Sequence, residues 1–222
     1  AQAEAQTGVA LPASQRSALH AMMKNKVTIL TGGPGVGKTT LIRCLTTLLA
    51  RQNRRIVLCA PTGRAARRLS ETTGQPAQTI HQLLGAIPGS GKFQHGLGRR
   101  LALDVLIVDE CSVVDVPLMF ALLNATPDNA MVVLAGDNDQ LPSAGPGRVF
   151  GDLIDSGRIP VVRLMEIFRQ AETSDIITAA HQIRKGIEPQ FAEKGTVSDC
   201  YFVQAETVES TLDKLIILVR DR

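Results

Sequence analysis

The sequence predicts an α/β protein with a mainly parallel sheet and helices on both faces. Short β-rich apolar runs recur along the chain, at residues 27–30, 56–60, 105–108, 131–135 and 159–164. Longer segments with helix-like spacing separate them, at residues 39–50, 65–72, 116–123 and 148–154. Strands that alternate with helices indicate a parallel sheet. The strand segments are almost continuously apolar, as strands covered on both faces should be.

The remaining segments define the expected organisation of the chain. Two more helices are expected, over residues 13–23 and 175–185. The glycine-rich stretch 87–101 interrupts the alternation and is expected to be an insertion or a mobile loop. After Gly186 the alternation fades, so residues 187–199 are expected to form a connector and residues 201–222 a strand followed by a helix.

These segments give three expected parts. Residues 1–10 form a polar leader, or mark a cut made within a longer chain. Residues 11–189 form the main domain. Residues 190–222 form a connector that leads toward a further domain.

Composition excludes several classes of protein. The 222 residues are 44% hydrophobic, which predicts a packed globular domain rather than disorder. No apolar run approaches the roughly 18 to 20 residues that span a bilayer, and the first ten residues do not resemble a signal peptide. The four cysteines have no C-x-x-C spacing and three lie in apolar stretches. We therefore expect a cytoplasmic protein without a membrane segment or a structural metal.

Charge is distributed unevenly along the chain. Residues 1–103 carry fourteen Lys and Arg and two acids, whereas residues 104–222 carry ten Lys and Arg and nineteen acids. The first part therefore favours a polyanionic partner such as nucleic acid. The alternative is that these charges lie on solvated helix faces and partly cancel in space.

The strongest motif is the phosphate-binding pattern G-x-x-x-x-G-K-[ST] at residues 32–39, between a predicted strand and a predicted helix. Its glycines let backbone N–H groups turn toward a phosphate, and the helix that follows adds its positive end. Lys38 is suited to the β- and γ-phosphates and Thr39 to Mg²⁺. The residues expected to bind the nucleotide here are Gly33, Pro34, Gly35, Val36, Gly37, Lys38, Thr39 and Thr40.

Two acidic residues end a second predicted strand. Asp109 and Glu110 follow the apolar run 105–108. Asp109 is expected to hold Mg²⁺ through water, and Glu110 to orient and deprotonate the attacking water. Hydrolysis needs the second carboxylate, whereas a simple kinase does not need it. The alternative for such a pair is a helix N-cap.

A third strand end carries polar residues that follow the run 131–135. Gln140 is suited to sensing a γ-phosphate, because its amide donates to phosphate and accepts from water. For Asn138 an Asx turn remains an alternative. Because ligands bind at the carboxyl ends of parallel strands, the three elements are expected to converge on one site.

Taken in order, these motifs resemble superfamily 1 DNA helicases. The segments are GGPGVGKTT, APTGRAARRL, TIHQLLG, VDECS and GDNDQLPS. They are most similar to the RecD-like branch, which includes the α subunit of exodeoxyribonuclease V and its stand-alone relatives. The resemblance covers residues 11 to 189 or so. It implies a RecA-like fold that uses ATP and Mg²⁺ to move 5′→3′ along single-stranded DNA in repair or recombination.

The resemblance also implies roles that the residues alone do not give. Gln15 matches a glutamine that reads adenine. Arg169 matches an arginine directed at the γ-phosphate, with a structural salt bridge as the alternative. The positions that match DNA-contacting stretches are Pro61, Thr62, Gly63, Arg64, Arg68, Thr79 and His81. The alternatives are solvated arginines on the helix expected over residues 65–72, and a helix cap for Thr79.

The family's second RecA-like domain is absent from this sequence, so we expect a fragment of a longer helicase. Such a fragment should bind nucleotide weakly and hydrolyse it slowly. Expected partners are single-stranded DNA and the subunits of an exodeoxyribonuclease V-type complex. Two other readings stay open: the helicase part of a conjugative relaxase, and a non-motor P-loop switch or kinase.

Overall fold

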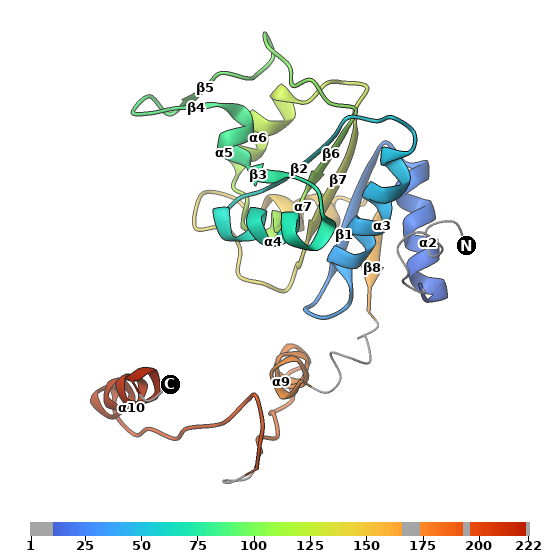
Figure 1. The fold of residues 1–222 in the computed structure, drawn as a ribbon. Helices are drawn as coiled ribbons and strands as arrows, with labels where there is room; N and C mark the ends of the chain where they lie inside the picture. Colours follow the sequence, from blue (N-terminus) through green and yellow to red (C-terminus); the bar gives the residue numbers. More distant parts are fainter. Residues whose placement is uncertain (1–10, 166–173, 193–195, 221–222) are drawn as a thin grey trace. The chain divides into compact units, whose positions relative to one another are not determined.

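The computed structural model describes residues 11–165, 174–192 and 196–220. Contacts within the chain define two compact units, which divide between residues 168 and 169. This division falls earlier than the expected end of the main domain at residue 189. The first unit contains the sheet and its covering helices (Figure 1).

The first unit is built on a six-stranded parallel sheet with the order β3-β2-β6-β7-β1-β8. The strands are β1 (Val27–Gly32), β2 (Ile56–Ala60), β3 (Ala77–Thr79), β6 (Val105–Val108), β7 (Met131–Gly136) and β8 (Val161–Leu164). All five predicted strands are present. The sixth, β3, was not predicted.

Helices cover both faces of this sheet. They are α2 (Ala13–Lys24), α3 (Lys38–Ala50), α4 (Gly63–Thr73), α5 (Ile80–Leu84), α6 (Val116–Ala125) and α7 (Val149–Asp155), with a 3-10 turn η1 (Cys111–Val113). Successive strand residues alternate between two buried clusters: Leu30 packs with the α2, α3 and α4 side, and Ile29 with the α5, α6 and α7 side. The predicted α/β class with a doubly covered sheet is therefore confirmed.

The glycine-rich insertion contains a small antiparallel hairpin. Its strands are β4 (Ala86–Ile87) and β5 (Lys92–Phe93), and Gly89 and Gly91 take positive φ angles in the turn between them. The ring of Phe93 lies against that of His81 on α5, with centroids 5.9 Å apart. This contact connects the hairpin to the sheet domain.

The second unit contains α9 (Asp175–Arg184) and α10 (Val208–Arg220). The strand expected near residue 201 is not formed; residues 201–205 have no regular structure. All side chains of α10 are exposed except that of Ser210, which is partly buried. None of the helices in the described part of the chain has the length and apolarity needed to cross a membrane.

Candidate nucleotide site

The phosphate-binding motif forms the loop between β1 and α3. Gly37 stands in the left-handed region at φ 86°, and α3 begins at the next residue, Lys38. A Cβ atom on Gly32 would lie 2.6 Å from the Leu164 carbonyl oxygen and 2.8 Å from Val36 Cγ2. The loop therefore requires glycine at both ends, at Gly37 for its dihedral angles and at Gly32 for its contact with β8.

The side chain of Lys38 folds back over this loop. Its Nζ atom donates hydrogen bonds to the carbonyl oxygens of Gly32 at 2.6 Å and Gly33 at 2.9 Å. Burial lowers the pKa of Lys38, and the carboxylates of Asp137, Asp109 and Glu110 oppose that shift in decreasing order. The lysine thus shares one electrostatic environment with three acidic side chains.

The paired acids stand at the carboxyl end of β6. The backbone N–H of Asp109 donates to the Cys59 carbonyl at 2.9 Å, and that of Glu110 donates to Asp109 Oδ1 at 3.0 Å. Burial raises the pKa of both carboxyls, and Lys38 opposes the rise in both. The P-loop lysine follows β1 and the two carboxylates follow β6, so these groups stand at the same edge of the sheet, where their charges act on one another.

Glu110 has an unusual backbone. It takes φ 55° and ψ 39°, the left-handed conformation that non-glycine residues rarely adopt. Glu110 precedes η1, but its side chain makes no capping hydrogen bond there. The N-cap alternative therefore does not account for its carboxylate, and the backbone turn is a feature of the site.

The donor atoms near the loop suit a hard cation. Thr39 lies in the first turn of α3 and offers a hydroxyl, while Asp109 offers a carboxylate. Magnesium is commonly held by one or two protein oxygens together with phosphate oxygens and water. The described residues contain no group of three His, Cys, Asp or Glu side chains placed to hold a metal ion.

The end of β7 places Asp137 beside Lys38, a position that sequence reasoning missed. Asp137 is 4% exposed, whereas Gln140 is exposed. Asp137 Oδ1 accepts from the Asp139 N–H at 3.1 Å, so the Asx turn forms at Asp137 rather than at Asn138. Its position immediately after a buried strand, like that of Asp109, is the signal that could have identified it.

Gln15 connects α2 to the loop. The side chain is 3% exposed and Nε2 donates to the Val36 carbonyl at 3.2 Å. Its Oε1 atom is buried without a hydrogen-bond partner. A buried amide with a free acceptor has the chemistry to receive an N–H donor of a base.

Most of the predicted DNA-contacting residues lie at the neighbouring ends of β2 and β3, whereas Arg68 lies in the middle of α4. Ala60 pairs with Thr79 in this parallel register, so the two stretches 61–64 and 79–81 start side by side. Thr62 caps α4 by accepting from the Ala65 N–H, and Thr79 caps α5 in a reciprocal capping box with Gln82. The capping alternative for Thr79 is therefore realised, whatever else its hydroxyl contacts.

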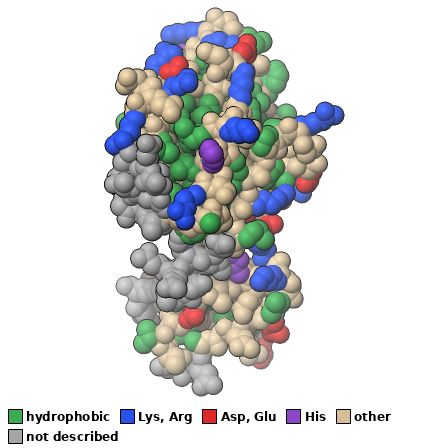
Figure 2. All heavy atoms as spheres, turned by 90° about the vertical axis from the view of Figure 1, so that its right-hand side faces the viewer, with side chains coloured by type: hydrophobic (Ala, Val, Ile, Leu, Met, Phe, Trp, Pro, Cys, Tyr) green, Lys and Arg blue, Asp and Glu red, His purple; other side chains and the backbone are tan. Residues whose placement is uncertain are grey.

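These predicted contacts differ in exposure. Pro61 is partly buried, whereas Gly63, Arg64, Arg68 and His81 are exposed. Figure 2 shows a different face, on the side of α2 and β8, where Lys and Arg side chains are spread with fewer acidic side chains among them. Arg169 lies outside the described residues.

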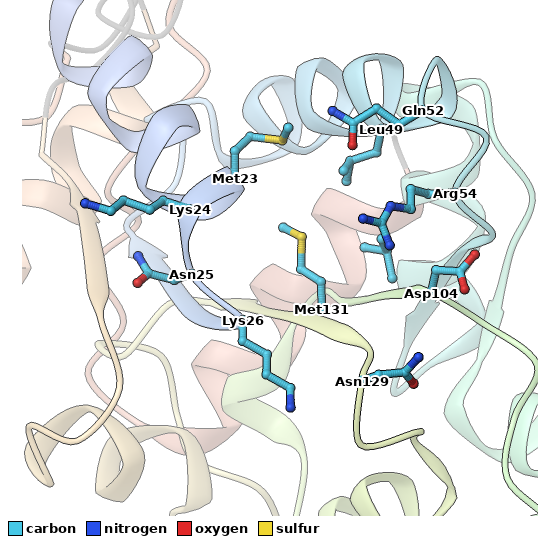
Figure 3. A pocket seen from close by; sticks show the side chains of 11 residues that line it. Met23, Lys24, Asn25, Lys26, Leu49, Gln52, Arg54, Asp104, Asn129 and Met131 are labelled. Atoms are coloured by element: carbon cyan, nitrogen blue, oxygen red, sulfur yellow. The ribbon is translucent and has the colours of Figure 1, made fainter.

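A separate cavity of about 290 Å³ lies at the opposite edge of the sheet (Figure 3). Lys26, Asp104 and Met131 border it at the amino ends of β1, β6 and β7, and Met23 and Leu49 contribute apolar walls. The candidate nucleotide site is at the carboxyl ends of these strands, so this cavity is not part of it.

The parallel sheet carries a glycine loop, the lysine of that loop and two strand-end carboxylates at one edge. This combination defines a P-loop nucleotide-binding domain of the RecA-like class. The comparisons agree with this class. A family model described as an AAA domain matches residues 10–200, and the chain belongs to that family.

Two curated relatives and one solved structure show which proteins this chain is similar to. The ATP-dependent RecD2 DNA helicase of Deinococcus radiodurans is 40% identical over 83% of this chain and 25% of its own length. The RecBCD enzyme subunit RecD of Mycolicibacterium smegmatis is 39% identical over 78% of this chain and 35% of its own. The Pif1 helicase from Candida albicans superposes with TM-score 0.61 at 25% identity, over 82% of this chain and 45% of that chain. The chain thus spans about a quarter to a third of these curated relatives.

Proposed function

We propose that this chain is the first motor domain of a RecD-like DNA helicase, which hydrolyses Mg·ATP to move along single-stranded DNA. The observation that carries the proposal is the shared environment of Lys38, Asp109 and Glu110 at one sheet edge. Both similar bacterial proteins are RecD-type proteins. The 5′→3′ direction and a role in repair or recombination rest on that similarity.

Each group has a role that its position supports. Loop amides around Gly35 and Gly37 bind phosphate oxygens, and Lys38 leaves the loop carbonyls to contact the β- and γ-phosphates. Thr39 and Asp109 would hold Mg²⁺, which neutralises phosphate charge when bound. Glu110 orients the attacking water and accepts its proton.

Further groups complete the proposed site. Gln15 reads the adenine edge through its unpaired Oε1 atom. Gln140 responds to the γ-phosphate from the end of β7. Arg169 contributes a cation to the same phosphate. Of these, Gln15 has the most direct support, because its amide already contacts the loop at Val36.

DNA would cross the ends of β2 and β3. The exposed Arg64, the N–H of Gly63 and the hydroxyls of Thr62 and Thr79 suit phosphate and sugar contacts rather than base reading. The strand order places the Asp109–Glu110 pair between this surface and the P-loop. DNA contact and hydrolysis therefore meet at adjacent strand ends, which is the arrangement a motor requires.

The decisive experiment measures ATP hydrolysis by the full-length protein with and without single-stranded DNA. Strong stimulation by DNA supports the motor, and no stimulation favours a non-motor P-loop module. Binding to a fluorescent oligonucleotide should weaken steeply as salt rises, because phosphate contacts release counterions. A flat salt profile would exclude the basic surface as the DNA site.

The similarity to RecD-type proteins supports two proposals about the full-length protein. A second motor domain elsewhere in the full protein would complete the ATP site, so this domain alone should hydrolyse ATP slowly. A RecD subunit role would bring nuclease and helicase partners of an exodeoxyribonuclease V-type complex in the cytoplasm. Co-purification of the full-length protein from its host separates a complex subunit from a stand-alone enzyme.

A further inference from the structure

The cavity at the amino ends of β1, β6 and β7 has walls of adaptable apolar side chains. Met23 on α2 and Met131 on β7 are partly buried, and Leu49 on α3 is buried. Figure 3 shows the side chains of both methionines and of Leu49 directed into the same space. Methionine adapts to partners of different shape, and its sulfur contacts aromatic rings favourably. These walls therefore suit an aromatic group.

The volume of the cavity limits what it can hold. At about 290 Å³ it lies at the lower end of the range for small-molecule sites, which is roughly 300–1,000 Å³. It reaches the surface, because Gln52 and Asn129 at its border are exposed. One aromatic side chain that enters from outside fits this space better than a ligand the size of a cofactor.

Three exposed cations border the cavity: Lys24, Lys26 and Arg54. None of them forms an ion pair with another residue that the structure describes. Figure 3 shows the Arg54 guanidinium directed toward the space, while the two lysines extend outward from its edge. The border therefore attracts negative charge.

The carboxylate of Asp104, which also lines the cavity, does not cancel this positive charge. Its Oδ2 atom accepts from the Arg55 backbone N–H at 2.8 Å and from Arg55 Nε at 3.2 Å, and its Oδ1 atom accepts from Arg55 Nη2 at 3.0 Å. Figure 3 shows this carboxylate turned away from Met131. Because Arg55 neutralises Asp104, Arg54 keeps its charge for a ligand.

We propose that this cavity is a docking site for an acidic segment of a partner protein. The segment inserts one aromatic side chain between Met23 and Met131 and sets carboxylates against the three border cations. The guanidinium of Arg54 is placed to contact the inserted ring as well, because arginine stacks on aromatic faces. The proposed nucleotide and DNA sites lie at the carboxyl ends of the strands, so this inference does not depend on the proposed function.

Fluorescence anisotropy of a labelled peptide tests the proposal in the full-length protein. The peptide carries one phenylalanine between short runs of aspartate. Replacing this phenylalanine with alanine should weaken binding about tenfold or more, the size expected when one aromatic side chain is no longer buried.

Two substitutions test the charges at the border. Arg54→Glu should weaken peptide binding about fivefold, because it removes an exposed charge pair and adds a like-charge contact. ATP binding by this variant should equal that of the wild type, which shows that the fold is intact. Arg51→Glu is the matched control, because it reverses an exposed arginine of the same segment that does not line the cavity.

A photoreactive benzophenone in place of the phenyl ring locates the bound peptide. Cross-links to Met23 or Met131, with weaker binding by Arg54→Glu and not by Arg51→Glu, support the proposal. Cross-links elsewhere, equal binding of the phenylalanine and alanine peptides, equal effects of the two substitutions, or no binding by the wild type overturn it. If Arg54→Glu weakens binding of a single-stranded oligonucleotide and leaves peptide binding unchanged, the border is a nucleic-acid surface, and the proposal is wrong.

Discussion

The Nζ atom of Lys38 lies 2.6 Å from the carbonyl oxygen of Gly32, the first residue of its own phosphate-binding loop. The lysine therefore binds its own loop, and phosphate oxygens must replace two carbonyl acceptors as its partners. Burial lowers the pKa of this amine, so the charged form is held in the site at a cost to folding.

Lys38→Ala should weaken ATP binding about 10- to 100-fold, because charge-assisted hydrogen bonds contribute roughly 1.5–3 kcal/mol. The melting temperature should not fall, since the variant removes a partly buried charge that burial disfavours. Titration calorimetry and thermal melting measure the two effects. The control Lys24→Ala removes an exposed lysine at the end of α2. A variant that binds ATP as tightly as the wild type would exclude Lys38 from the phosphate site.

The sequence predicted elements well where apolar runs were long. Strands β2 and β6 have the predicted bounds because every residue in them is apolar. Two of the missed elements, β3 and α5, have three and five residues, too few for a periodic pattern. The strand expected near residue 201 reflects an apolar run that finds no neighbouring strand in the described chain.

The sequence also predicted part of the site. Motif spacing located Lys38 and Glu110, whereas the burial of Asp137 beside Lys38 depends on how three strand ends meet. The left-handed backbone of Glu110 also has no sequence signal. A glutamate gives no reason to expect that conformation, which tertiary structure imposes.

Gly32→Ala should destabilise the domain by about 2 kcal/mol or more, because the added methyl meets backbone that cannot move aside. The obstacle is the Leu164 carbonyl oxygen at 2.6 Å. Gly98→Ala is the control, since nothing lies within 4 Å of a Cβ there. Chemical denaturation of both variants provides the comparison. Equal stability would show that β8 does not approach the loop so closely.

Stability in acid should depend on the pair of Arg55 and Asp104, which joins the amino ends of β2 and β6. Hydrogen bonds from the Arg55 side chain and backbone lower the pKa of Asp104 to about 2, from an ordinary value of 3.8. A carboxyl whose pKa is lower in the folded state stabilises the protein at pH values above its ordinary pKa. That stability is lost as the pH falls through the folded-state pKa. The contribution should therefore be complete at pH 6 and absent below pH 2 or so.

Asp104→Asn should accordingly melt below the wild type at pH 6, with a difference that shrinks as pH falls under about 4. In an Arg55→Gln background the same substitution should have little effect, because the partner is gone. Melting curves of the four proteins across this pH range measure the coupling. A difference that is constant with pH would show that the pair does not set the ionisation of Asp104.

Substitutions at Glu110 should separate its backbone role from its chemical role. Glu110→Gln should bind ATP normally and lose hydrolysis, since the amide cannot accept the proton. Glu110→Gly should be more stable than Glu110→Ala by about 1 kcal/mol, because alanine keeps the cost of φ 55° and glycine does not. At ordinary positions the order is reversed, by about 0.5–1 kcal/mol in favour of alanine. Denaturant unfolding of the two variants shows directly which of them is more stable. If Glu110→Ala is the more stable variant, the left-handed turn is not held in solution. The carboxylate would then have to reach the site from another backbone conformation.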